Sequence, residues 1–431
     1  MKSLVWFRND LRVADNASLQ KACQGDRVIA VYCIDPSLFE KGPYSFRKME
    51  KYRAKFLLQT LGDLKKNLAL LNISLLIYPQ KAKDVIPDLI EKYEIDRVCL
   101  QKEWTRDELK ELSEVREKCS VNIEFIETYD QFLFHPEDIP FKNISDLPDI
   151  FTQFRKQCEK YARVRECLDI PEAKGPENML SESTPIPELK DLGFSPFEPH
   201  PHTAFPFRGG ENAALARIEE YFWETKKLAY YKKTRNGLLG KDYSSKLSPW
   251  LANGSISPRT IYREVKRFEK EIKKNQDTYW LIFELIWRDY FKYVSLKYGD
   301  AIFQLGGILK KDYPWNNSEA ARTSWINGTT SEPFVNANMI ELAKTGWMSN
   351  RGRQNVASFW AKELKQDWRI GASYFEAMLI DYDVHSNWGN WMYNSGVGND
   401  PRDRKFNIQR QAEMYDPQGK FQNRWLQQSL F

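Results

Sequence analysis

Residues 381–400 read DYDVHSNWGNWMYNSGVGND and crowd acids, amides and aromatic rings into one short stretch. Asp381 and Asp383 stand two residues apart at its start, and the glycines within it allow the backbone to approach another group closely. An Asp-rich helix end followed by a polar loop would have the same composition. Taken alone, the stretch therefore indicates either the lining of a ligand pocket or a surface turn.

Residues 231–254 hold a second polar block, with YKKTRNG at 231–237 and DYSSKLSPWLANG at 242–254. Three serine hydroxyls and Lys246 fall within five residues at a predicted helix start. Hydroxyl and backbone donors combined with a positive charge suit the oxygens of a diphosphate. An unusually polar helix N-cap is the competing interpretation.

A third block, FELIWRDY at 283–290, places an acid and a tryptophan on one helix face, because Glu284 and Trp287 are three residues apart. A stacking ring beside a hydrogen-bonding carboxylate suits a flat ligand with polar edges. The alternative is a core tryptophan with Glu284 in a surface ion pair.

A fourth block, TGWMSNRGRQN at 345–355, contributes Arg351 and Arg353. Two neighbouring arginines usually belong to a solvated surface. A buried acid elsewhere in the fold would nevertheless need such a partner, because an isolated charge is costly to remove from water.

Ahead of these blocks, short β-branched runs alternate with helical segments. Strands are expected at 3–7, 27–35, 74–78, 97–101 and 122–128, with helices between them at 53–71, 83–93 and 106–119. Continuous apolar strands joined by crossover helices predict a parallel sheet that is covered on both faces. The first strand is not followed by GxGxxG, so the ordinary dinucleotide fingerprint is missing.

Residues 131–206 hold eleven of the 21 prolines, which is typical of a linker that wraps across a surface instead of forming a core. Amphipathic helices then dominate, at 213–225, 258–273, 278–298, 335–345, 354–365 and 374–381. The predicted division is an α/β domain at 1–130, a linker at 131–206 and an α-helical domain at 207–431.

Composition limits the class of protein. A length of 431 residues suits two domains, and no apolar run approaches the ~18 residues of a spanning helix. Arg8 and Asp10 interrupt the N-terminus before a signal peptide could form. The six cysteines lie between Cys23 and Cys167 without CxxC spacing, which predicts free thiols, no structural metal and a cytoplasmic location.

The two parts of the chain differ in charge. Residues after 206 carry 34 Lys+Arg against 25 Asp+Glu, whereas the first 206 carry 30 against 34. A basic second half can attract phosphates, although most basic surfaces are only solvated.

The four blocks, with the opening WFRNDLR at 6–12, resemble the motifs of the photolyase/cryptochrome family. The Asn-Trp-Gly-Asn-Trp and Gly-Val-Gly-Asn-Asp runs resemble its DASH branch, whose members act on single-stranded DNA. The resemblance extends from Trp6 to Leu426. It implies a Rossmann-like parallel-sheet domain followed by an all-α domain that binds FAD.

The resemblance also assigns roles by position. FAD contacts carry over to Tyr231, Ser244, Ser245, Lys246, Leu247, Ser248, Asn350, Arg353, Asp381, Asp383 and Asn387, with Arg353 paired to Asp381 and Asn387 facing flavin N5. The lesion cavity carries over to Glu284, Trp287, Asn350, Gln354 and Tyr393. A path for electrons from the flavin to solvent carries over to Trp391, Trp368 and Trp315.

Many family members also hold an antenna chromophore between their domains. Glu103, on the loop after the fourth strand, fits the acid used by members that bind folate. The resemblance favours methenyltetrahydrofolate, with a deazaflavin as the other candidate. A helix-capping surface glutamate remains an equal interpretation of Glu103.

Two departures bear on the substrate. Gln354 and Tyr393 stand where photolyases active on duplex DNA carry methionine and tryptophan. Lost stacking area should weaken the flipping of a dimer out of a duplex and leave single strands easier. The loop at 401–404 is one residue shorter than usual in the DASH branch, which argues against a DNA contact there.

The expected activity is therefore blue-light-driven repair of cyclobutane pyrimidine dimers, preferentially in single-stranded DNA, by a light-dependent lyase. The alternative is a blue-light receptor that signals through a protein partner. Receptors of the family usually carry a long C-terminal tail, and this chain ends five residues after Leu426. We expect no membrane association and no obvious protein partner. The basic helical domain and the pair formed by Glu284 and Trp287 argue against a redox flavoprotein unconnected with DNA.

Overall fold

Five parallel strands form the sheet of the N-terminal part of the chain. The computed structural model describes residues 1–119 and 122–427. The strand order is β3-β2-β1-β4-β5, with β1 at Lys2–Trp6, β2 at Arg27–Cys33, β3 at Leu75–Tyr78, β4 at Arg97–Gln101 and β5 at Glu124–Thr128. All four pairings are parallel. The predicted sheet is confirmed, and each strand begins and ends within two residues of its predicted position.

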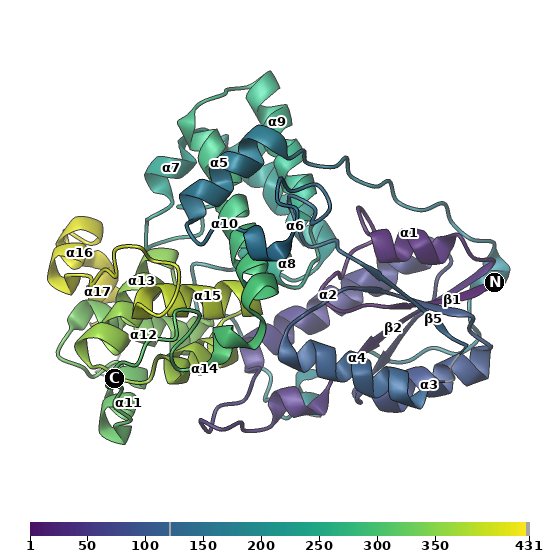
Figure 1. Cartoon of the computed structure of the whole chain (residues 1–431), viewed down its shortest axis with the longest axis horizontal. Helices are drawn as coiled ribbons and strands as arrows, with labels where there is room; N and C mark the ends of the chain where they lie inside the picture. Colours follow the sequence, from purple (N-terminus) through teal and green to yellow (C-terminus); the bar gives the residue numbers. More distant parts are fainter. Residues whose placement is uncertain (120–121, 428–431) are drawn as a thin grey trace.

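Helices cover both faces of this sheet, as Figure 1 shows. Successive side chains of a strand point to opposite faces, so Val5 enters one core with α1 and α2, whereas Leu4 enters the other with α3 and α4. The four helices are α1 at Ala17–Cys23, α2 at Lys51–Ala69, α3 at Ala82–Tyr93 and α4 at Arg106–Lys118. Burial on both sides explains why the strands are almost continuously apolar.

The segment at 131–206 does not behave as a surface linker throughout. Phe132, Leu133 and Phe134 are buried in the core of the helical part. The helix α5 (Phe151–Tyr161) buries Phe151 and Phe154 in the same core and lies beside α10 in Figure 1. Phe194 and Phe205, near the end of the segment, also enter the two cores. The expectation that this segment forms no core is therefore wrong, because high proline content obscured a helix with an apolar face and buried aromatic side chains. The boundaries at residues 130 and 206 stay a prediction.

Helices α6 to α17 build the remainder of the described chain. They are α6 at Glu211–Ile218, α7 at Tyr231–Thr234, α8 at Ser248–Ala252, α9 at Pro258–Glu271, α10 at Gln276–Tyr298, α11 at Glu319–Ile326, α12 at Pro333–Thr345, α13 at Asn350–Ser358, α14 at Trp368–Met378, α15 at Val384–Ser395, α16 at Ile408–Tyr415 and α17 at Lys420–Leu426. The predicted all-α architecture is confirmed. No helix of residues 1–119 and 122–427 is long and apolar enough to cross a bilayer.

The prediction did not include α11, α15, α16 and α17, and two predicted helices begin earlier than expected. The helix α13 begins four residues before the expected start, since the Ser349 side chain accepts a hydrogen bond from the Gly352 amide. The helix α14 begins six residues early, where Asp367 caps it. Short polar side chains satisfy the first free amide groups of a helix, and an apolar stripe does not reveal that position.

A buried ion-pair network joins the sheet to the helical part. Arg259 on α9 donates from Nε to Asp15 Oδ2 at 2.9 Å and from Nη2 to Asp15 Oδ1 at 2.7 Å. It also donates to Asp130 Oδ1 at 2.8 Å. All three side chains are buried. Removal of one partner would leave a buried charge unpaired. The network therefore fixes how the sheet domain meets the helical domain.

Candidate functional site

A cavity of about 400 Å³ opens in the helical part. The loop before α8 forms one side, and α10, α13 and the start of α15 contribute the others. A smaller space of about 70 Å³ shares Asn350, Arg353 and Asp381 with it and extends toward Asn387 and Trp391. Cavities of this size that combine apolar walls with a few polar groups are the usual form of a ligand site.

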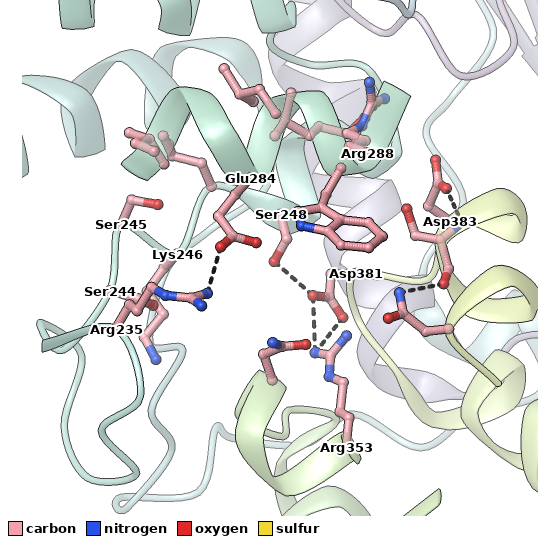
Figure 2. Close-up of a pocket in the computed structure, with 18 of the residues that line it drawn as sticks. Arg235, Ser244, Ser245, Lys246, Ser248, Glu284, Arg288, Arg353, Asp381 and Asp383 are labelled. Carbon is pink, nitrogen blue, oxygen red and sulfur yellow. Dashed lines mark hydrogen bonds and ion pairs between the residues drawn. The ribbon is translucent and has the colours of Figure 1, made fainter. Parts of the chain in front are cut away.

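Asp381, Arg353 and Ser248 form one connected group, which we call the cradle (Figure 2). Arg353 Nη2 donates to both carboxylate oxygens of Asp381, at 2.8 and 3.0 Å. The Ser248 hydroxyl donates to Asp381 Oδ2 at 2.6 Å. The Asp381 side chain is only 3 % exposed. Its hydrogen bonds to Arg353 and Ser248 therefore offset the cost of removing its carboxylate from water.

The loop Ser244–Leu247 lines the cavity beside the cradle. Lys246 has φ 64° and its Nζ is buried without a hydrogen-bond partner. The ammonium group lies 3.0 Å from the centre of the Tyr243 ring and 4.6 Å from that of Trp347. Burial lowers the pKa of Lys246 well below its usual value. An unpaired buried cation at the wall of a cavity is suited to an anionic ligand.

Asp383 begins α15 and carries a second fixed charge. Its carboxylate accepts a hydrogen bond from the Ser386 amide at 2.8 Å and pairs with the buried Lys292 at 3.0 Å. Burial alone would raise the pKa of Asp383, but Lys292 holds it far below its usual value. On the same helix, the Asn387 amide donates to the Ala372 carbonyl at 3.0 Å, which fixes its orientation in the smaller space.

Glu284, Trp287 and Tyr393 line the aromatic end of the larger cavity. Glu284 pairs with Arg235 at 2.6 Å, and both side chains keep 20–28 % exposure. Burial raises the pKa of Glu284, and Arg235 offsets part of this rise. The pair, visible in Figure 2, agrees with the ion pair in the alternative interpretation of Glu284, although the sequence argument did not name Arg235 as the partner.

The Trp287 ring is stacked on Phe151 of α5, with centroids 3.6 Å apart. Tyr393 meets Trp287 edge-on at 6.0 Å, and its hydroxyl accepts a hydrogen bond from Arg404 at 2.8 Å. Phe151 covers one face of the ring, the centre of the Phe291 ring lies 5.5 Å from its centre, and Trp287 also lines the cavity. Arg404 and Gln354 also line this cavity, so the short 401–404 loop contributes to its wall, while the expectation about DNA contact there stays a prediction.

Comparisons with known proteins agree with this arrangement. Residues 3–177 match the DNA photolyase family model, and residues 280–429 match the FAD binding domain of DNA photolyase. A Xenopus laevis protein described as cryptochrome DASH is 46% identical over 425 residues, covering 97% of this chain and 81% of that relative. The chain belongs to the photolyase/cryptochrome family, in its DASH branch.

Two solved structures extend the likeness to the fold. A Synechocystis cryptochrome superposes with a TM-score of 0.94 at 45% identity, over 99% of this chain and 88% of that one. A class III photolyase from Agrobacterium tumefaciens gives a TM-score of 0.81 at 25% identity, over 99% and 86%. The fold class is thus that of photolyases and cryptochromes, with an FAD-binding helical domain.

The predicted site residues of this DASH-branch chain fall into three groups. The larger cavity brings together Tyr231, Ser244, Ser245, Lys246, Leu247, Ser248, Glu284, Trp287, Asn350, Arg353, Gln354, Asp381, Asp383 and Tyr393. Asn387 and Trp391 line the smaller one. Glu103, Trp315 and Trp368 line neither of these two spaces. Their roles, like those of the cavity residues, stay predictions.

Trp391 and Trp368 are buried, and Trp315 is partly exposed. Trp391 packs on α14, where an added Cβ at Gly371 would lie 2.2 Å from its ring. Trp368 donates from Nε1 to the Leu305 carbonyl at 2.9 Å. The chain next to Trp315 meets that next to Trp368 through a bridge between Asn316 and Gln366. Exposure is thus greater at Trp315 than at Trp368 and Trp391, and the path through these three residues stays a prediction.

Glu103 lies in the interface between the sheet and the helices and is 4 % exposed. Its Oε1 accepts hydrogen bonds from Gln101 at 2.7 Å and Asn9 at 3.3 Å. The surface-cap interpretation is therefore wrong. The adjoining Trp104 is stacked on His385 of α15 with centroids 4.6 Å apart, so the loop after β4 touches the helix that carries Asn387.

Proposed function

We propose that this protein binds FAD and uses blue light to repair cyclobutane pyrimidine dimers, with a preference for single-stranded DNA. The observation that carries the proposal is that one cavity unites the cradle with Glu284 and Trp287. An electron donor bound at one end would thus lie close to a pyrimidine bound at the other. Membership of the family supports both ligands.

FAD fits the residues that are present. The unpaired Lys246 Nζ and the hydroxyls of the 244–248 loop suit a diphosphate, while Asp381 and Asp383 supply acceptor oxygens beside their arginine and lysine partners. When bound and reduced, the flavin would supply one electron on excitation and take it back after the dimer has split. The protein would bind and orient the flavin and keep water away from it, and Asn387 would present a neutral amide to the ring.

At the aromatic end, Glu284 would hydrogen-bond a pyrimidine edge and Trp287 would stack on it. Tyr393 and Gln354 present less stacking area than a tryptophan and a methionine. Stacking contributes about 1–3 kcal/mol per base, similar to the few kcal/mol needed to flip a damaged base. A partial loss can therefore decide against duplex DNA, whereas a single strand avoids most of the cost.

Three further assignments accompany the proposal. Trp391, Trp368 and Trp315 would return electrons to an oxidised flavin. Glu103 would hold an antenna chromophore, with methenyltetrahydrofolate favoured over a deazaflavin. The excess of Lys+Arg after residue 206 would attract the DNA backbone, and the six free thiols favour a reducing compartment such as the cytoplasm.

The decisive experiment measures light-dependent repair of one dimer in matched oligonucleotides: single-stranded, fully paired, and paired with the dimer in an unpaired bubble. We expect efficient repair of the single strand and the bubble, and weak repair of the duplex. Equal rates on all three would refute the pocket argument. Protein that holds reduced FAD yet repairs none of them would favour the photoreceptor alternative.

A further inference from the structure

Two residues of the 381–400 stretch, Tyr382 and Trp388, have no role in the assignments above. Trp388 is buried and meets the ring of Trp368 edge-on, with centroids 5.7 Å apart. Its indole Nε1 donates a hydrogen bond to the Tyr382 hydroxyl at 3.3 Å. A contiguous contact thus runs from the predicted tryptophan path to a tyrosine.

The Tyr382 hydroxyl also has a proton acceptor. It is a side-chain hydrogen-bond partner of the Glu376 carboxylate. The hydroxyl accepts from Trp388 and donates to Glu376, so its single proton already points along one bond. Burial raises the pKa of Glu376 to about 7, which leaves a base strong enough to take a proton from an oxidised phenol.

Arg53 of α2 adds a constraint from the N-terminal domain. Its guanidinium lies 4.6 Å from the centre of the Tyr382 ring, and its Nη2 donates to the Glu376 backbone carbonyl at 2.9 Å. A cation over the ring opposes a positive charge on the tyrosine. Loss of an electron from Tyr382 must therefore be coupled to loss of its proton.

We propose that Tyr382 is a redox-active residue. It reduces the oxidised tryptophan of the path through Trp388 and passes its phenol proton to Glu376. With FAD bound, Trp391 would give one electron to the light-excited oxidised flavin, and Trp368 would then reduce the oxidised Trp391. One electron then passes from Tyr382 through Trp388 to Trp368, and the O–H bond of Tyr382 breaks. The proton forms an O–H bond on Glu376, which leaves a neutral tyrosyl radical and a neutral carboxylic acid. The flavin is reduced by one electron and Tyr382 is oxidised by one.

This inference rests on the proposed flavin and tryptophan path and extends it. Separation of the proton from the tyrosine would slow the return of the electron, because recombination has to recover the proton as well. The branch from Trp368 through Trp388 would place the radical on Tyr382 instead of on Trp315, the solvent end of the path.

The test follows the full-length, FAD-loaded protein by transient absorption and electron paramagnetic resonance after a blue flash at pH 8.5, without added reductant. We expect a tryptophan radical first and then a tyrosyl radical, whose formation slows in D2O. In Tyr382→Phe the tyrosyl signal should be lost and recombination should be faster, with the first tryptophan signal unchanged. Trp388→Phe should give the same loss without touching the tyrosine.

Glu376→Gln retains size but cannot take the proton as readily, so the tyrosyl signal should fall and its D2O effect should disappear. Tyr374→Phe is the matched control, since Tyr374 is a buried tyrosine of α14 that contacts Trp325 instead. A tyrosyl signal that persists in Tyr382→Phe, or a wild type that forms only tryptophan radicals, overturns this inference and leaves the proposed path intact. FAD that is bound but oxidises no tryptophan overturns the path, and this extension with it.

Discussion

The two ends of the cavity hold their carboxylates in different ways. In the cradle, Asp381 accepts three hydrogen bonds from Arg353 and Ser248 and is almost fully buried. At the aromatic end, Glu284 has a single ion pair with Arg235 and stays about a quarter exposed. The buried, fully paired carboxylate of Asp381 suits a ligand that stays bound. The partly exposed carboxylate of Glu284 can exchange its ion pair with Arg235 for a contact with a substrate.

The difference predicts that the tryptophans beside the cradle end serve the flavin alone. Trp391→Phe preserves a ring against Gly371 but is far harder to oxidise, so photoreduction should be abolished while FAD remains bound. Photoreduction is measured from the flavin absorbance under blue light. Trp425→Phe removes an equally buried tryptophan outside the cavity and should photoreduce normally. A wild-type rate in Trp391→Phe would remove that residue from the path.

The cradle should fail as a unit when its acid is removed. Asp381→Ala leaves Arg353 without its partner, and loss of one member of a buried pair costs about 3–5 kcal/mol, so FAD affinity should fall by roughly a hundredfold or more. Titration with FAD, followed by flavin fluorescence, measures this. Glu284→Gln should bind FAD as the wild type does. If both variants lose FAD equally, the contrast between the two ends is wrong.

The aromatic end should instead control the choice of substrate. Tyr393→Trp restores stacking area beside Trp287, and a gain of about 1–2 kcal/mol would raise duplex repair roughly tenfold. Repair of the single strand should change much less, because it requires little unstacking. The ratio of the two rates is the measurement, with Tyr393→Phe as the control for loss of the bond to Arg404. An unchanged ratio of the two repair rates would show that the ring of residue 393 does not determine the discrimination against duplex DNA.

A smaller effect should appear behind the cradle, at Glu341. Burial raises the pKa of Glu341 to about 8, and the Lys246 ammonium opposes part of this rise. The folded state therefore binds the proton more tightly than the unfolded state, and this group lowers stability as the pH rises from about 4.5 to 8. Glu341→Gln removes this loss, so its stability relative to wild type should increase by at least about 1 kcal/mol between pH 5 and pH 8.

Urea unfolding of the FAD-free protein at both pH values checks this prediction. Glu114→Gln changes an acid on α4 instead, in the sheet domain, and should follow the wild-type pH dependence. A Glu341→Gln difference that is the same at pH 5 and pH 8 would show that Glu341 does not titrate in this window.

The sequence by itself determined the parts of this protein that depend on short-range patterns. Apolar runs such as 28–31 predicted the strands, because the centre of a strand that is buried on both faces has to be apolar. The four blocks named the cavity residues, since acids, amides and rings seldom gather without a ligand or a core to justify them. The motif resemblance also paired Arg353 with Asp381, and the structure forms that pair.

Only the tertiary structure decided which partners those residues have across the chain. Phe151 reached Trp287 from a proline-rich segment that sequence reasoning treated as a surface linker. Arg235 forms an ion pair with Glu284, and Arg53 of the N-terminal domain lies over the ring of Tyr382. Such contacts join positions 49 to 329 residues apart. No local periodicity encodes them, because they follow from how whole helices pack once their apolar faces are buried.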